Sequence, residues 1–132
     1  MDWKHFENEL QTLAEKVTEK PDIIMGIARG GLIPARLLST YLKVKKMHCL
    51  SVVKVGNTRE VVTEITEELT GKKILLVEDV LETGRSLTVA KEYLENKGAA
   101  VITACLYTMP ISEIIPDYYL KEIDSIEKFP WE

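Results

Sequence analysis

The chain has 132 residues, of which 45% are hydrophobic and 29% charged, as is typical of one globular domain spanning residues 1–132. No stretch approaches the ~18 uninterrupted apolar residues that cross a bilayer, and the charged N-terminal segment does not resemble a signal peptide. We therefore expect a cytoplasmic protein with no membrane contact. The formal net charge of -4 disfavours a general nucleic-acid binder but leaves room for a site that binds a small anion.

Apolar runs alternate between helical and strand spacing along the whole chain. In chain order, the pattern predicts a helix over residues 2 to 19, a strand over 23 to 27, a helix over 34 to 41, a strand over 49 to 53, a turn or mobile loop over 55 to 59, an edge strand over 60 to 66, a strand over 73 to 77, a helix over 86 to 97 and a strand over 99 to 106. This alternation indicates an α/β domain with an open, mostly parallel sheet flanked by helices on both faces.

The cysteines and histidines carry no recognisable chemistry. Cys49 and Cys105 lie in separate apolar runs, without a neighbouring Cys or His at metal-ligand spacing, so we expect both thiols to be buried. His5 and His48 also lack partners at such a spacing and are expected to be surface or packing residues.

Two adjacent carboxylates, Glu78 and Asp79, follow the predicted strand over residues 73 to 77. In an open parallel sheet, ligands bind beyond the carboxyl ends of the strands, where the loops lead into helices. Adjacent acids can accept hydrogen bonds from two vicinal hydroxyls, as on ribose, or bind a divalent metal that the substrate already chelates.

The turn that follows, from Glu82 to Ser86, combines a glycine, Gly84, with hydroxyl and guanidinium groups and precedes a helix. Thr83, Arg85 and Ser86, together with the free N–H groups of the helix, suit a monophosphate. The turn is not a P-loop, because no Gly-Lys-Ser/Thr is present.

Residues 77 to 86, VEDVLETGRS, resemble the phosphoribosyl-pyrophosphate signature of the type I phosphoribosyltransferases. The resemblance implies that Glu78 and Asp79 hold the ribose hydroxyls and that the turn from Glu82 to Ser86 holds the 5-phosphate. Glu82 matches a position at which purine members usually place an Asp, proposed as the general base toward the nucleobase.

A second segment, residues 26 to 36 (GIARGGLIPAR), resembles the pyrophosphate loop of the same family. It lies about fifty residues before the acid pair, in the family's order. Arg29 is the matching basic residue, and Gly30 and Gly31 allow unusual dihedral angles. The chain most closely resembles the small xanthine-guanine or hypoxanthine phosphoribosyltransferases. For the fold, the resemblance implies a Rossmann-like domain with a short hood formed by the terminal segments.

The end that should bind the base departs from this pattern. Purine members usually carry a lysine before the proline that follows the last core strand, and here Met109 precedes Pro110. Ile126 stands where they tend to place a stacking aromatic residue. The alternatives that could stack from a neighbouring position are Tyr107, Tyr118, Tyr119 and Phe129. The Ser-Tyr pair of the mobile loop is also absent, so Lys54 or Arg59 becomes the candidate to cover the pyrophosphate.

The resemblance implies a Mg²⁺-dependent enzyme that transfers 5-phosphoribosyl from phosphoribosyl pyrophosphate to a nucleobase, expected to be guanine, xanthine or hypoxanthine. It also implies a homodimer, and the apolar face of the helix from Pro34 offers a surface for one. The alternative is a non-catalytic module of the same fold that senses phosphoribosyl pyrophosphate or a nucleotide. Met109 and Ile126 favour this alternative and Glu82 disfavours it, because a sensor needs no base.

Overall fold

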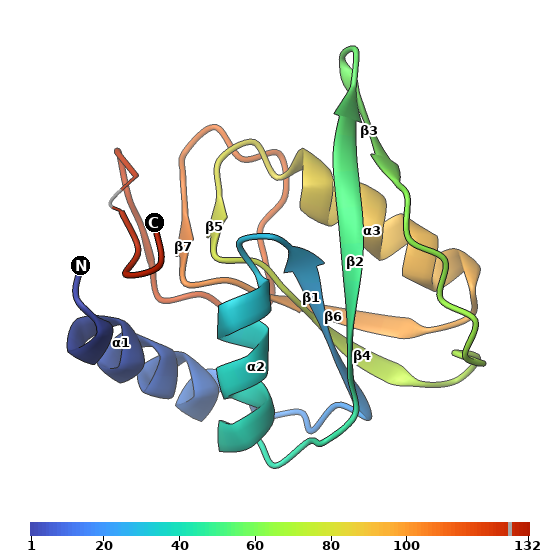
Figure 1. The fold of residues 1–132 in the computed structure, drawn as a ribbon, viewed down its shortest axis with the longest axis horizontal. Helices are drawn as coiled ribbons and strands as arrows, with labels where there is room; N and C mark the ends of the chain where they lie inside the picture. Colours follow the sequence, from blue (N-terminus) through green and yellow to red (C-terminus); the bar gives the residue numbers. More distant parts are fainter. Residues whose placement is uncertain (127) are drawn as a thin grey trace.

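A computed structural model describes residues 1–126 and 128–132. Figure 1 shows a central sheet with helices on both faces and a smaller layer beside its upper edge. In chain order the elements are α1 (Trp3–Lys16), β1 (Ile23–Ala28), α2 (Leu32–Tyr41), β2 (Met47–Val55), β3 (Thr58–Val61), β4 (Lys73–Val77), β5 (Val80–Leu81), α3 (Arg85–Asn96), β6 (Ala100–Ala104), β7 (Tyr107–Thr108) and β8 (Lys121–Glu122).

The main sheet has five strands in the order β3-β2-β1-β4-β6. All neighbours are parallel except β2 and β3, which form an antiparallel hairpin at one edge. The predicted open, mostly parallel sheet is therefore confirmed. Because β1, β2, β4 and β6 run in the same direction, their carboxyl ends lie along one edge, and the polar segments that follow β1 and β4 are placed there together.

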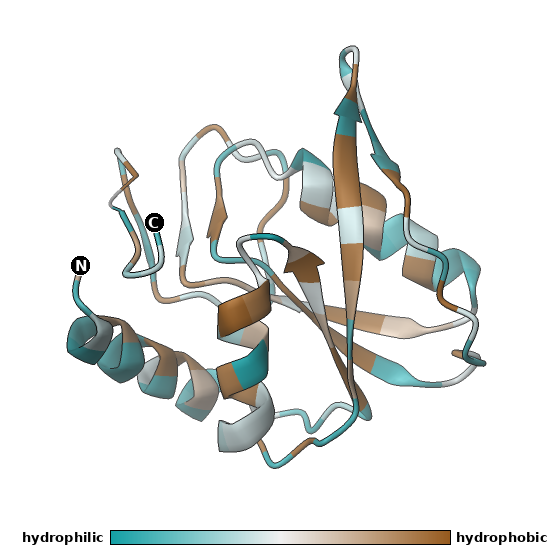
Figure 2. Cartoon of the chain, viewed as in Figure 1, coloured by the Kyte–Doolittle hydropathy of each residue, from teal (hydrophilic) through white to brown (hydrophobic). Residues whose placement is uncertain are grey.

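Two apolar layers cover the sheet, one on each face. Strand residues that point one way, such as Met25 and Leu76, pack with Leu87, Ala90 and Leu94 of α3. Residues that point the other way, such as Leu75, pack with α1 and α2. Figure 2 shows hydrophobic colour on much of the strands and mainly hydrophilic colour along α1.

The ends of the helices follow from their capping residues. The Asp2 carboxylate accepts a hydrogen bond from the His5 N–H at 2.7 Å, as predicted for the N-cap of α1. α3 is followed by Gly98 with a φ of 89°, a left-handed conformation that glycine adopts without strain. α1 ends at Lys16, earlier than the predicted limit of residue 19.

The segment over residues 55 to 59, predicted as a turn or mobile loop, is the turn of the β2–β3 hairpin with the adjoining ends of its two strands. Two other predictions need correction. The edge strand runs from Thr58 to Val61 rather than from 60 to 66. Cys49 is exposed, whereas Cys105 is buried as predicted. The Cys49 side chain points away from Leu50 and Val52, which pack toward α3, and the helices of the other face leave it uncovered.

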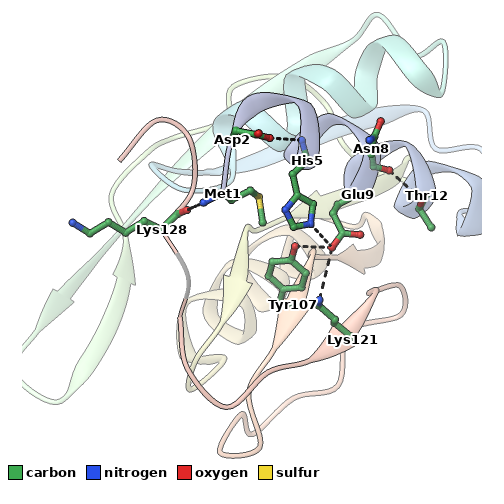
Figure 3. Close-up of polar contacts among 9 residues, drawn as sticks. All are labelled: Met1, Asp2, His5, Asn8, Glu9, Thr12, Tyr107, Lys121 and Lys128. Atoms are coloured by element: carbon green, nitrogen blue, oxygen red, sulfur yellow. Dashed lines mark hydrogen bonds and ion pairs between the residues drawn. The ribbon is translucent and has the colours of Figure 1, made fainter.

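The tail, to which the sequence pattern assigned no regular structure, completes a second sheet of three short parallel strands in the order β5-β7-β8. We call β5, β7, β8 and residues 109 to 120 the hood. Glu9 of α1 binds it by accepting a hydrogen bond from the Tyr107 hydroxyl at 3.0 Å and lying 3.9 Å from Lys121 Nζ (Figure 3). The N-terminal ammonium also donates to the Lys128 carbonyl, so α1 supports both the hood and the C-terminal segment.

Candidate active site

Glu78 and Asp79 lie where β4 leaves the main sheet and the chain turns into β5 of the hood. The backbone fixes this pair: the Glu78 N–H donates to Ala104 O at 3.0 Å, and Asp79 O accepts from the Leu106 N–H at 3.0 Å. The side chains bond locally, with Asp79 Oδ1 accepting from the Val80 N–H at 2.6 Å. The two carboxylates are thus held side by side at the carboxyl edge of the sheet.

Burial dominates the electrostatics of this acid pair. It raises the pKa of Glu78 well above its ordinary range, and the neighbouring Asp79 charge raises it further. Burial also raises the pKa of Asp79, partly offset by the N–H groups that bond its carboxylate. Two partly desolvated acids are therefore poised to accept hydroxyl donors or a cation, either of which would stabilise their charged forms.

The turn between β5 and α3 has the conformation of an anion site. Gly84 is the N-cap of α3 with a φ of 79°, and it has no side chain to cap the helix. Apart from the Arg85 N–H, the amides of the first turn therefore point toward the loop with no side-chain hydrogen bond from the N-cap residue. Thr83 Oγ1 accepts from the Arg85 N–H at 3.3 Å, which orients the hydroxyl at the mouth of the turn.

A polar pocket of about 180 Å³ joins this turn to the acid pair. It is lined by Arg59, Glu78, Val80, Leu81, Glu82, Thr83, Gly84, Arg85, Ser86 and Leu87. The structure thus brings Glu78 and all five residues of the predicted phosphate turn into one cavity. Arg59 also lines this cavity. The sequence comparison had suggested Arg59, or Lys54, as a residue that covers the pyrophosphate.

The loop over Arg29, Gly30 and Gly31 lies beside Asp79, with a cis peptide bond between Ala28 and Arg29. A Cβ on Gly30 would lie 2.7 Å from Asp79 Oδ1, so the loop passes directly over that carboxylate. A Cβ on Gly31 would overlap the Val77 carbonyl oxygen of β4. The absence of side chains at these two positions brings the loop against the acid pair.

Residues 112 to 114 lie near the phosphate turn, although nothing in the sequence predicted a role for them there. They belong to the tail, to which the sequence pattern assigned no regular structure. The Glu113 N–H donates to Thr83 O at 2.9 Å, and the Glu113 carboxylate lies 3.9 Å from Arg85 Nε. A Cβ on Gly84 would lie 2.7 Å from the Ser112 hydroxyl oxygen. Residues 112 to 114 therefore pack against the outer side of the turn.

The three candidates for the base end lie apart from this pocket. Met109 is half-buried, and its N–H donates to Leu81 O at 2.9 Å, at the start of the turn that follows β7. Ile126 is 48% exposed. Phe129 is 3% exposed and stacks on Trp131, with ring centroids 4.8 Å apart, and on Tyr107 at 6.1 Å. Both faces of the Phe129 ring are therefore covered by aromatic side chains of the chain itself.

The donors suit a metal carried by the substrate. Among the described residues, no group of three or more His, Cys, Asp or Glu side chains could hold a metal ion. Glu78 and Asp79 supply carboxylate oxygens, which Mg²⁺ prefers, and Mg²⁺ commonly binds proteins through one or two carboxylates together with substrate oxygens. The acid pair therefore fits a metal that arrives with a phosphorylated substrate.

A larger cavity of about 560 Å³ lies at the opposite edge of the sheet, at the C-terminal end of α2. Its lining includes Arg36, Lys43 and Lys45 but no carboxylate. We place the site at the smaller pocket because it lies at the carboxyl ends of the parallel strands, beside the acid pair and the N-terminus of α3. No helix in the described part of the chain is long and apolar enough to cross a membrane.

Comparison with known proteins identifies the family of the chain. The family model described as the phosphoribosyl transferase domain matches residues 2–132. The hypoxanthine-guanine phosphoribosyltransferase of Lactococcus lactis is 30% identical over 82% of this chain, which covers 64% of that protein. The xanthine-guanine phosphoribosyltransferase of Gluconobacter oxydans is 26% identical over 98% of this chain and 82% of its own length.

Among solved structures, the purine phosphoribosyltransferase of Pyrococcus horikoshii superposes with a TM-score of 0.93 at 35% identity. The match covers 100% of this chain and 91% of that one. The family model and the solved structure agree, and the chain belongs to the phosphoribosyltransferase family.

Proposed function

We propose that the protein is a purine phosphoribosyltransferase, which transfers 5-phosphoribosyl from phosphoribosyl pyrophosphate to a purine base and releases pyrophosphate. The observation that carries the proposal is the single pocket that joins Glu78 to the turn from Glu82 to Ser86, with Asp79 and the Arg29 loop beside it. The names of the relatives from Lactococcus and Gluconobacter make guanine, hypoxanthine and xanthine the bases to test.

The sugar phosphate occupies the two parts of this pocket. The Glu78 and Asp79 carboxylates accept hydrogen bonds from the 2- and 3-hydroxyls of the ribose. The 5-phosphate lies at the N-terminus of α3, where the Thr83 and Ser86 hydroxyls and the backbone amides donate to it. Holding the sugar at both ends fixes carbon 1 relative to the leaving group and the incoming base.

During transfer, the bond between carbon 1 and the pyrophosphate oxygen breaks and its electron pair leaves with the pyrophosphate. Arg29, the Gly30 amide and, from the β2–β3 hairpin, Lys54 stabilise the negative charge that develops there. The Gly31 N–H donates to Ile27 O at 2.8 Å, so Gly31 contributes its close backbone approach and not a donor. A ring nitrogen of the purine forms the new bond to carbon 1, and Glu82 accepts the proton which that nitrogen loses. Glu82 is exposed and lines the pocket, so its carboxylate is accessible to a base.

Magnesium fits as the cofactor that arrives with the substrate. Bound there, it would neutralise charge on the pyrophosphate oxygens. Glu78 and Asp79 would hold it through their carboxylates, and binding would favour the ionised form of both acids, whose pKa values burial raises.

We place the purine against the hood, near the turn that begins at Met109, with the exposed Ile126 as the candidate residue of the C-terminal segment. Phe129 can contact a base only if its ring is first uncovered, because Tyr107 and Trp131 stack on it. Met109 offers an apolar contact where the resemblance expects a lysine ammonium, and its carbonyl accepts from the Ser112 N–H at 3.0 Å. We also propose a cytoplasmic homodimer that contacts neither nucleic acid nor membrane. Light scattering of the purified protein tests the dimer.

Release of pyrophosphate from phosphoribosyl pyrophosphate with Mg²⁺, measured across a panel of purine and pyrimidine bases, tests the transfer. We expect turnover with at least one of guanine, hypoxanthine and xanthine. Glu82→Gln should lower kcat by roughly 100-fold, because the proton acceptor is lost, whereas Glu82→Asp should retain more activity. Tight binding of phosphoribosyl pyrophosphate without turnover on any base would instead indicate the sensor.

A further inference from the structure

The β2–β3 hairpin carries a guanidinium at the mouth of the phosphate pocket. Figure 1 shows the hairpin rising beside the N-terminal end of α3, and Figure 2 shows its upper end as hydrophilic. Every residue from Val53 to Glu60 is exposed except Arg59, which is half-buried and lines the pocket with the turn from Glu82 to Ser86. Arg59 is thus partly withdrawn from water at the tip of an exposed hairpin.

The cross-strand register places a second cation directly beside it. Lys54 of β2 is paired with Arg59 of β3, and the next pair along the same face is Val52 with Val61, which packs toward α3. Like charges directly opposite each other in an antiparallel pair are destabilising. The face of the hairpin that points toward α3 therefore carries two cations, an arrangement that an anion would stabilise.

Within the described part of the chain, Arg59 has no acidic partner. Among residues 1–126 and 128–132, its guanidinium makes one long hydrogen bond, from Nη1 to Thr58 O at 3.4 Å, and forms no ion pair. The other guanidinium of the pocket, Arg85, lies 3.9 Å from the Glu113 carboxylate. Arg59 is therefore available to a ligand.

We propose that Arg59 binds the 5-phosphate of the phosphoribosyl group, so that the hairpin closes the phosphate site from the side opposite the turn from Glu82 to Ser86. This role rests on the proposed function. A guanidinium can donate two parallel hydrogen bonds to phosphate, on the side that the α3 amides do not reach. The pyrophosphate loop over Arg29 to Gly31 is not part of this pocket, so Arg59 serves the 5-phosphate end of the substrate.

Calorimetric titration with ribose 5-phosphate and, separately, with inorganic pyrophosphate tests the assignment. Arg59→Gln should weaken the binding of ribose 5-phosphate by roughly 10- to 100-fold, which is the range for a lost hydrogen bond between charged groups. The affinity for pyrophosphate should not change. The affinity of Arg59→Lys for ribose 5-phosphate should lie between those of the wild type and Arg59→Gln. Lysine keeps the positive charge but cannot donate two parallel hydrogen bonds. The comparison variant, Lys54→Gln, removes the opposite cation, which we assign to the pyrophosphate. It should weaken binding of ribose 5-phosphate by less than about 3-fold and binding of pyrophosphate by more.

Three results would overturn the assignment: unchanged ribose 5-phosphate binding in Arg59→Gln, equal losses in Arg59→Gln and Lys54→Gln, or a loss confined to pyrophosphate. Binding of ribose 5-phosphate requires neither base nor turnover. If the wild-type protein accepts no base yet binds ribose 5-phosphate through Arg59, the proposed transfer fails and the assignment stands. If transfer occurs with the same KM for phosphoribosyl pyrophosphate in Arg59→Gln, the assignment fails and the transfer stands.

Discussion

The phosphate end and the hood are built in different ways. The acid pair and the phosphate turn lie within residues 77 to 86, one uninterrupted stretch between β4 and α3 that also contributes β5 to the hood. The hood joins three short strands that are far apart in sequence, and it depends on α1 for support through Glu9. A site made from one segment depends mainly on its own residues, whereas a site made from several segments also depends on the contacts that hold them together.

The largest effect should come from the acid pair. Glu78→Gln with Asp79→Asn removes both charges with little change of shape, so activity should fall by roughly 1000-fold or more while the domain still folds. Circular dichroism and thermal unfolding serve as the folding controls. Retained turnover in this double variant would show that the contiguous segment does not hold the reacting sugar.

Substitution of the two loop glycines, Gly30 and Gly31, should affect different properties: one substitution should mainly lower stability and the other mainly lower activity. Gly31→Ala places a Cβ against backbone atoms of β1 and β4, which cannot move aside, and should lower the free energy of unfolding by about 3 kcal/mol. Gly30→Ala meets the Asp79 carboxylate, a side chain that can rotate, and should reduce activity more than stability. Denaturant unfolding and turnover of both variants provide the test, and equal stability losses would contradict it.

Substitutions in the contact between α1 and the hood, away from any bound ligand, should alter stability and base binding. Tyr107→Phe removes the hydroxyl that donates to Glu9 and should lower the free energy of unfolding by about 1 kcal/mol. We expect KM to rise for the base more than for phosphoribosyl pyrophosphate. Tyr118→Phe is the matched control, because its hydroxyl makes only a 3.4 Å contact with Thr18. If KM rose equally for the base and for phosphoribosyl pyrophosphate, the hood and the phosphate end would not be held in place independently, which would contradict the proposed difference.

The smallest effect concerns pH. The pKa of Glu78 is raised in the folded protein above its ordinary value of 4.5, so in that range the folded state binds more protons than the unfolded state. The free energy of unfolding should therefore fall as pH rises from about 4.5 through the raised pKa. Glu78→Gln should reduce this fall and stabilise the ligand-free protein at neutral pH, whereas Glu64→Gln, at an exposed position, should not. Unfolding curves at several pH values measure the difference.

The same contrast explains how far the sequence could predict the structure. The main strands and α3 were predicted because their apolar spacing is regular, and the phosphate turn because its residues are consecutive. The short strands of the hood were missed, since two residues have no periodicity. The position of Arg59 in the pocket depends on the pairing of β3 with β2, which no local pattern encodes.

A crystal structure of the protein with bound guanosine monophosphate, the product of transfer to guanine, tests the central claim most directly. We predict that its phosphate lies at the turn from Glu82 to Ser86, its ribose hydroxyls at Glu78 and Asp79, and its base against the hood near Met109. A nucleotide seated instead in the cavity beside Arg36, Lys43 and Lys45, with the turn from Glu82 to Ser86 making no contact with phosphate, would contradict the account.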